Sequence, residues 1–417
     1  MQSLKEKALH VLQWSERYTK TDMVHLSKGG FWLLFGYVSQ TVTGLILMVA
    51  FTNLTSKDTY GTYQFIMAGA GIITGFTLSG MGTAISRAVA KGSDGALPYG
   101  FQKQFLWNIG VIIAGAVASI YYFIVGKNDL AIAFLMVGFF EALLSGLSLY
   151  KPFLVGKELF KENVTIGIWR KSIPIVVILI ALLLTDDPIV LVLAYYVSST
   201  ISTGLMYRLI RRRYPAPPAP DPELFDLSKH LSIIGLATRI TANVDKMLIF
   251  YFLGPAQVAI YTLALFPVTH LENLFSLVGQ LVLPRFVRHN LSSIKEGLPR
   301  KLGIFFCAIA ATVLGYILLA KYIFGLFFPA YTEAVLLTQV AMLSMLVKPR
   351  SLFEQTFTAH NMKRSLYTYR ISSAVIKIAL LVILIPMYGL WGAVWAFLAT
   401  HVYSSILSTT LFYKYEK

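Results

Sequence analysis

The sequence is poor in charge, and acidic residues are especially scarce. Asp, Glu, Lys and Arg make up only 13% of the 417 residues, whereas water-soluble domains carry about 25%. The hydrophobic share is 56% and the mean hydropathy is +0.66. The one cysteine, Cys307, excludes both an intrachain disulfide and a metal site built from several thiolates. These deficits are typical of a chain that lies largely within a lipid bilayer.

Motifs for several kinds of chemistry are also missing. No stretch fits the phosphate-cradling pattern G-x-x-x-x-G-K-[ST], so direct use of ATP by this chain is not expected. H-E-x-x-H does not occur, and the seven histidines are scattered without the spacing of metal ligands. We therefore expect no catalytic residue, no metal and no cofactor, and we do not expect an enzyme.

Apolar runs long enough to cross a bilayer dominate the chain, since a spanning helix needs roughly 20 such residues. Twelve runs are found, at about 29–53, 61–84, 105–126, 130–150, 165–185, 188–208, 231–253, 257–284, 302–324, 332–358, 368–386 and 390–412. The Pro-rich stretch PAPPAPDP (215–222) divides them into two groups of six and is typical of an extended linker. This pattern predicts an all-α polytopic membrane protein with 12 transmembrane helices in two six-helix lobes.

The expected domains follow from these runs. They are an N-terminal cytoplasmic or interfacial segment (1–27), an N-lobe (28–210), a cytoplasmic linker (211–230), a C-lobe (231–413) and a cytoplasmic tail (414–417). A faint repeat supports the two lobes, because Leu-Ser-Lys opens the first run at 26–28 and the seventh at 227–229. The lobes are thus expected to be parallel duplicates.

Positive charge predicts the orientation. With the N-terminus inside, the segments on the inner side carry 30 of the 36 Lys and Arg residues, and the outer loops carry only Lys57, Lys127 and Lys321. This asymmetry places both termini in the cytoplasm under the positive-inside rule. The net charge of +16 is then a topology signal, and nucleic acid is not an expected partner.

Ionisable residues inside spans are costly unless they face a cavity or a partner, so each is a candidate functional residue. The seventh run is the richest, with Arg239, Asn243 and Lys246 on one helical face and Asp245 on a neighbouring face. The alternative for this group is an internal salt bridge, for instance between Asp245 and a cation on another helix.

Other spans contribute single polar residues, namely Gln40, Glu141, His270, Glu272, Asn273, Arg350 and Lys377. Arg350 could instead pair with Glu354, four residues on, and Arg170 and Lys171 could reach back to the inner surface. Among the deep residues the cations are in slight excess, so a shared cavity would suit an anionic substrate.

Several segments resemble those of the lipid-linked oligosaccharide (O-antigen or polysaccharide) flippases, within the multidrug/oligosaccharidyl-lipid/polysaccharide exporter superfamily. They are SKGGFWLLFGYVSQ (27–40), LTSKDTYGTYQF (54–65), GFTLSGMGTAISRAVAKG (75–92), NVDKMLIFYFLGPAQVAIYTLA (243–264) and YGLWGAVWAF (388–397). The chain departs from the family where Ile260, in place of the common glycine, precedes Tyr261.

The resemblance implies a MATE-like flippase fold whose V-shaped cavity opens alternately to each side. It further implies a polyprenyl-pyrophosphate-linked oligosaccharide as the molecule moved, from the inner to the outer leaflet of the cytoplasmic (inner) membrane, for polysaccharide biosynthesis. Partners would be this glycolipid and membrane lipids, and other polysaccharide-assembly proteins remain open.

On this hypothesis, the pyrophosphate is bound by Arg239, Lys246, Lys377 and Arg350, and the glycan by Gln40, Asn243, His270 and Asn273. Coupling to an ion through Asp245, Glu141 or Glu272 is left open. The alternative function is a cation-coupled multidrug and toxin exporter of the same superfamily, which would have a mainly acidic cavity. A membrane glycan polymerase or ligase is disfavoured because the outer loops are only a few residues long.

Overall fold

The computed structural model describes residues 23–218, 222–288, 291–350, 353–354, 356–357 and 362–414. These residues are almost entirely helical, and no strand occurs among them. Two parts of the predicted domains lie outside the described residues. They are residues 1–22 of the expected interfacial segment (1–27) and residues 415–417 of the expected tail.

The described residues of the first half, from residue 23 on, form nine α-helices and one short 3₁₀ turn. They are α2 (Met23–Leu54), α3 (Lys57–Ile73), η1 (Thr74–Phe76), α4 (Met81–Ala90), α5 (Ala96–Trp107), α6 (Ile109–Ile124), α7 (Asn128–Leu147), α8 (Tyr150–Gly156), α9 (Phe160–Leu184) and α10 (Pro188–Arg213). Two predicted spans are thus built from pairs of consecutive helices, α5 with α6 and α7 with α8.

The elements in the described part of the second half include several longer helices. These elements are α11 (Pro222–Leu253), α12 (Pro255–Arg288), α13 (Leu291–Phe327), η2 (Pro329–Tyr331), α14 (Ala334–Met342), η3 (Leu343–Arg350) and α16 (Lys363–Lys414). Helix α16 folds back on itself at Gly389, whose φ of 59° breaks the helical conformation, and Ser404 Oγ donates to Ser373 Oγ across the two halves at 2.8 Å. These halves match the two runs predicted at 368–386 and 390–412.

The helix ends follow from local sequence. Ser56 caps α3 by accepting a hydrogen bond from the amide of Thr59, and Asp187 caps α10 ahead of a proline at its first position. Gly254 has a φ of +88° and separates α11 from Pro255, the first residue of α12, because glycine tolerates this left-handed conformation. The predicted breaks between spans therefore coincide with capping residues.

Eight helices in the described part are long and apolar enough to cross a membrane, or nine if α3–η1 and α4 form one broken span bent by 57°. Helix α11 has 32 residues but is not among them, since Arg239, Asp245 and Lys246 interrupt its apolar sequence. The segment Ala334–Pro349 is apolar but short. The protein is thus a multi-pass membrane protein, while the number of twelve spans and the cytoplasmic termini stay predictions.

Large apolar side chains cover the outside of the bundle. Leu184 is 79% exposed, Ile124 78% and Leu326 74%. Such a surface would be unstable in water but is the expected one in contact with lipid tails, which are as apolar as these side chains. The buried core lies inside the bundle, where Tyr60, Tyr196 and Tyr261 are each at most 1% exposed.

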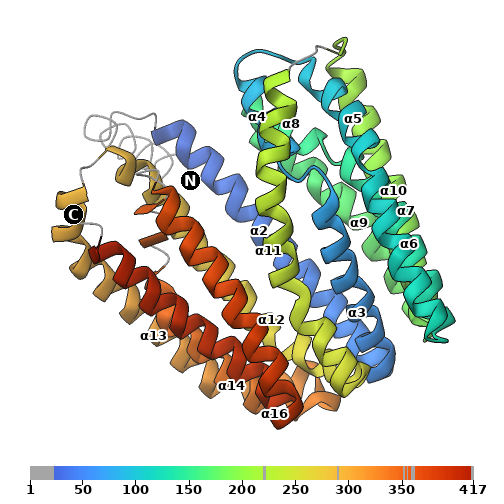
Figure 1. Cartoon of the computed structure of the whole chain (residues 1–417), viewed down its shortest axis with the longest axis vertical. Helices are drawn as coiled ribbons and strands as arrows, with labels where there is room; N and C mark the ends of the chain where they lie inside the picture. Colours follow the sequence, from blue (N-terminus) through green and yellow to red (C-terminus); the bar gives the residue numbers. More distant parts are fainter. Residues whose placement is uncertain are drawn as a thin grey trace, which may run out of the picture.

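Helix α11 stands in the middle of the molecule and packs on both halves (Figure 1). It contacts α3 and α4 of the first half of the chain and α12 and α16 of the second half. We keep the names N-lobe and C-lobe for these two halves, while their division into two six-helix lobes stays a prediction. Helix α2 runs obliquely past it and packs on α9. Because α2, α3, α11 and α12 lie next to one another, any cavity between the lobes is expected to have their side chains as its walls.

Candidate functional site

A cavity of about 450 Å³ lies between the lobes, and its walls come from α2 and α3 on one side and from α11 and α12 on the other. Its lining residues are Gly44, Leu47, Met48, Phe51, Tyr60, Tyr63, Gln64, Met67, Ala242, Asn243, Asp245, Lys246, Tyr261, Thr262, Leu265, Phe266 and Thr269. Apolar and aromatic side chains predominate, with a few polar groups among them, which is the usual composition of a small-molecule site.

Lys246 provides a cation directly in this cavity. Its Nζ donates to Oε1 of Gln64 on α3, at 3.0 Å, so the ammonium is held across the gap between the lobes. Asn243 lines the same cavity, and its Nδ2 donates to the carbonyl of Arg239 one turn earlier. The shared face predicted for Asn243 and Lys246 is therefore the face that the cavity exposes.

Asp245 is the centre of a buried polar network. Its Oδ2 accepts from Tyr261 OH at 3.0 Å and lies 3.3 Å from Lys377 Nζ of α16, and the two charged side chains are 8% and 13% exposed. Lys377 also donates to the carbonyl of Thr241, at 2.6 Å. Lys377 thus contacts the cavity wall through Asp245. The Asp245–Lys377 ion pair is the internal salt bridge that the sequence offered as the alternative for this group.

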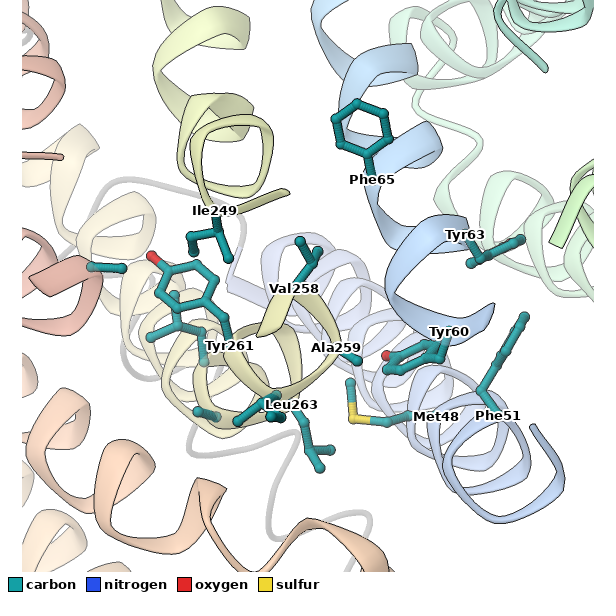
Figure 2. Close-up of a cluster of buried hydrophobic side chains, with 14 of the residues drawn as sticks. Met48, Phe51, Tyr60, Tyr63, Phe65, Ile249, Val258, Ala259, Tyr261 and Leu263 are labelled. Carbon is teal, nitrogen blue, oxygen red and sulfur yellow. The ribbon is translucent and has the colours of Figure 1, made fainter. Parts of the chain in front are cut away.

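Toward one end of the cavity, apolar side chains of α2, α3 and α12 belong to one buried cluster (Figure 2). Met48 and Phe51 of α2 and Tyr60 of α3 meet Val258 and Ala259 of α12, and all five are at most 5% exposed. This end lies toward the loops that charge patterning places outside the cell.

Polar contacts join the lobes at the same end. Asn53 Nδ2 donates to the carbonyl of Phe327 at 2.9 Å, and Lys57 Nζ lies 2.5 Å from Glu333 Oε1. In each contact one partner belongs to the N-lobe and the other to the C-lobe. We call these two contacts the outer latch, because they hold the lobes together where the apolar seam also closes.

His270 lies on α12 against α2. Tyr37 OH donates to the carbonyl of His270, and Thr41 Oγ1 lies 3.2 Å from His270 Nδ1. His270 is near the cavity but does not line it, and Asn273 is exposed farther along α12. Gln40 lies in a second cavity, between α2 and α9. The four predicted glycan ligands are therefore not gathered around one cavity, because α2 separates Gln40 from the others.

The remaining predicted residues are dispersed. Glu141 accepts from Tyr196 OH at 2.9 Å inside the N-lobe, and Glu272 Oε1 lies 3.1 Å from His401 Nε2 inside the C-lobe. Arg239 is exposed and interacts electrostatically with Glu141 across the lobes. Arg350 ends η3, and its side chain lies outside the described residues.

The pairing considered between Arg350 and Glu354 lies outside the described side chains. The structure pairs this carboxylate with Arg370, at 3.4 Å, on α16. Among the described residues no group of three or more His, Cys, Asp or Glu could hold a metal ion.

Several cavity residues are absent from the sequence-predicted set, above all Gln64 and the aromatic residues Tyr60, Tyr63 and Tyr261. A signal for all four did exist, since Tyr60, Tyr63 and Gln64 stand in LTSKDTYGTYQF and Tyr261 stands in NVDKMLIFYFLGPAQVAIYTLA, two segments that carry the family resemblance. A tyrosine in a span is not costly as a charged residue is, so a search for costly ionisable residues does not select it. Its ring and hydroxyl nevertheless suit a site that binds partly polar molecules.

Comparison with solved structures identifies the fold. The lipid II flippase MurJ in an inward closed conformation matches with a TM-score of 0.63 and 16% identity, over 91% of this chain and 86% of that one. An inward-facing multidrug resistance MATE family transporter of the MOP superfamily matches with a TM-score of 0.65 and 13% identity, over 90% and 94%. At these identities the likeness shows the fold, which is MATE-like and shared with MurJ.

An outward-facing MATE transporter of the same superfamily matches with a TM-score of 0.55 and 14% identity, over 94% of this chain and 96% of that one. No curated protein sequence matches the chain significantly.

The family described as "Polysaccharide biosynthesis protein" matches residues 26–289, which is more than half of the chain. The match covers α2 to α12 and therefore all four helices that form the central cavity. The chain belongs to this polysaccharide biosynthesis family of membrane proteins.

Proposed function

We propose that the protein is a flippase that moves a polyprenyl-pyrophosphate-linked oligosaccharide from the inner to the outer leaflet of the cytoplasmic membrane by alternating access. The observation that carries this proposal is the cavity between the lobes, which has Asn243, Asp245 and Lys246 on one wall and an apolar seam at the predicted outer end. MurJ, which shares the fold, is itself described as a lipid II flippase. The protein would catalyse no covalent step.

The cavity offers what such a headgroup needs. Sugar hydroxyls and a pyrophosphate cannot cross hydrocarbon unless other polar groups replace their water. Lys246 and Lys377 bring two positive charges, and Asp245 neutralises one of them, so the described polar wall retains a net positive charge. Tyr60, Tyr63 and Gln64 supply hydroxyl and amide groups for sugars, while the lipid tail would remain in the bilayer.

The predicted ligands are assigned to this function in the following way. Lys246, Arg239, Lys377 and Arg350 would bind the pyrophosphate, and Asn243, His270, Gln40 and Asn273 would meet the glycan as the lobes move. Arg239 is exposed on α11, ahead of Lys246 on the path from the predicted inner side. It would therefore meet the headgroup first. With the cell interior negative, moving two negative charges outward is favoured by roughly 4 to 5 kcal/mol per 100 mV.

The first test removes the cation in the cavity. Lys246→Gln keeps the length and polarity of the side chain but not its charge, and we expect it to slow translocation by about tenfold or more, since charge-assisted contacts to a phosphate are lost. Purified protein in proteoliposomes with a fluorescent polyprenyl-pyrophosphate oligosaccharide, quenched from outside, gives the rate. Arg239→Ala should have a similar effect.

The control is Lys321→Gln, which removes an exposed lysine of α13 outside the cavity. Its rate should equal that of the unmodified protein. Equal rates for Lys246→Gln, Arg239→Ala and the control, with all proteins folded and inserted, would rule out the assignment of the cavity as the headgroup path.

The second candidate function is a cation-coupled exporter of drug-like molecules, and the Asp245 network favours it. A buried carboxylate held by Tyr261 and Lys377 could exchange a proton or sodium as the lobes move. This function predicts efflux of cationic dyes that is abolished by Asp245→Asn. Dye efflux by proteoliposomes that do not translocate the glycolipid would favour it over the flippase.

A further inference from the structure

A second cavity, of about 270 Å³, lies inside the N-lobe between α2, α8 and α9. We call it the α2–α9 pocket. Three cations line it, namely Lys151 of α8 and Arg170 and Lys171 of α9, together with the polar residues Ser39, Gln40 and Asn163. No acidic residue is among its lining residues. The pocket is thus wholly basic, unlike the central cavity, where Asp245 faces Lys246 and Lys377.

The three cations lack anionic partners within the described part of the chain. Elsewhere partly buried cations are paired, as Lys157 is with Asp94 at 2.7 Å. No described carboxylate, by contrast, accepts from Lys151, Arg170 or Lys171. Arg170 Nε is buried, with less than 1 Å² accessible, and has no hydrogen-bond partner. A buried donor without a partner is rare in folded proteins, and it adds to the cost of leaving these cations unpaired.

Mutual repulsion makes the arrangement still more costly. Arg170 interacts unfavourably with both Lys151 and Lys171, so the three charges lie close enough to oppose one another. Snorkelling to the inner surface, the simple explanation for Arg170 and Lys171, would separate the charges and keep them in water. The fold instead turns all three toward one pocket. An anion there would offset both the repulsion and the lost hydration.

The pocket also has room for a ligand. Gly167 lines it, and a Cβ added at this residue would meet no atom within 4 Å. The uncharged polar lining groups are three hydroxyls (Ser39, Thr43 and Ser172) and two amides (Gln40 and Asn163), which can donate to phosphate oxygens as well as accept. Several cations with neutral donors around them are the usual set for a phosphate group carrying more than one charge.

We propose that the α2–α9 pocket binds a phosphate or pyrophosphate group through Arg170, Lys151 and Lys171. This site is separate from the central cavity, which lies on the other side of α2, where Gly44 and Met48 form its wall. It occurs in the half of the N-lobe next to the loop at 157–160, which charge patterning places in the cytoplasm. The group can come from a lipid headgroup in the inner leaflet or from a free anion.

Binding to the purified full-length protein in nanodiscs tests the proposal. One arm titrates inorganic pyrophosphate into nanodiscs of phosphatidylcholine, and the other titrates a short-chain polyprenyl pyrophosphate into the same nanodiscs. In at least one arm we expect Arg170→Gln to weaken binding by about tenfold or more, and Arg170→Lys to recover part of the loss. Arg212→Gln, which removes an exposed arginine of α10 outside the pocket, should bind like the unmodified protein.

A second variant separates loss of the site from loss of the fold. Gly167→Val narrows the pocket but leaves all three cations in place, and its added Cβ meets no atom within 4 Å. It should weaken binding as much as Arg170→Gln while the thermal stability is retained. If the two variants weaken binding of inorganic pyrophosphate, the ligand of the pocket is a free anion. If they weaken only the binding of polyprenyl pyrophosphate, the ligand is a lipid headgroup. Binding that neither variant changes, or no binding in either arm, overturns the proposal whatever the central cavity transports.

Discussion

At the scale of single residues, the Asp245–Lys377 pair is the feature that links α11 to α16. It is the ion pair with the lowest combined exposure among those described, with side chains 8% and 13% exposed. Two buried charges repay their lost hydration only when they stay paired and hydrogen-bonded. Tyr261 OH and the Thr241 carbonyl supply the additional hydrogen bonds. Removing the charge of one partner should therefore lower the free energy of unfolding more than removing both charges does.

A double-mutant cycle checks this expectation. Lys377→Met leaves Asp245 buried without its cation and should lower the free energy of unfolding by about 3 to 5 kcal/mol. The double variant Asp245→Asn with Lys377→Met should lose much less, since no buried charge remains. Chemical unfolding in detergent, followed by tryptophan fluorescence, gives the four values. Additive losses would mean that the two side chains are not coupled.

At the scale of elements, glycines bring α3 close to its neighbours. A Cβ at Gly61 would lie 1.8 Å from the carbonyl oxygen of Pro255 on α12, and one at Gly71 would lie 2.6 Å from Asn243 Nδ2 on α11. No side chain fits at Gly61, because the atom it would meet belongs to the backbone. The path of α3 between the lobes, and with it one wall of the central cavity, thus depends on residues that have no side chain.

Gly61→Ala tests this dependence. The methyl group would force α3 and α12 apart, and we expect the free energy of unfolding to fall by about 1 to 3 kcal/mol or more. The matched control is Gly315→Ala inside α13, where an added Cβ would meet no atom within 4 Å. That variant should gain stability, by up to about 1 kcal/mol, from the higher helix propensity of alanine. Thermal unfolding of the two purified variants under identical conditions makes the comparison, and equal effects would contradict it.

At the scale of the whole molecule, the outer latch and the apolar seam close the predicted outer end of the cavity. Alternating access requires this end to open, so each contact there contributes to the preference for the present conformation. Burial by itself raises the pKa of Glu333, but the hydrogen bonds from Lys57 and from the Glu333 backbone outweigh it, and the net pKa is lowered. The carboxylate of Glu333 therefore stays charged in the closed state.

The sign of the pH dependence follows from this pKa. A carboxylate whose pKa is lower in the closed state stabilises closure above its ordinary value, and the effect is lost as the pH falls through the lowered value. The population of the closed conformation should thus be unchanged between about pH 8 and pH 6 and should fall only on strong acidification. Glu333→Gln should mimic acid at neutral pH and raise the open population by about two- to fivefold, as for a partly exposed ion pair.

Spin labels at Asp129 and Ala330, which are both exposed near this end, report the separation of the lobes by electron resonance. The measurement needs Cys307→Ser, since this single cysteine is exposed. Lys321→Gln serves as the control variant. If Glu333→Gln leaves the distance distribution unaltered, the ion pair has no part in closure.

Local sequence predicted most of the helices and several of the site residues. The hydropathy runs located helices that end at capping residues such as Ser56 and Asp187, and the cost of charge in lipid singled out Asn243, Asp245 and Lys246 on α11, all of which line the cavity. It did not predict that α2 would separate Gln40 from these residues or that Glu141 and Glu272 would each pair inside its own lobe. Those outcomes depend on which helix lies opposite each side chain.

The sequence by itself thus determined that this protein lies in a lipid bilayer, that it is helical and which family it belongs to. Hydropathy, charge bias and local motifs are properties of contiguous residues, so they can be read without the tertiary structure. Only the tertiary structure decided which costly charges are neutralised and which remain available. Lys377 meets Asp245 from a helix more than a hundred residues away, whereas Arg170 meets other cations. The physical reason is that the energy of a buried charge depends on its neighbours in space, and packing of distant helices sets those neighbours.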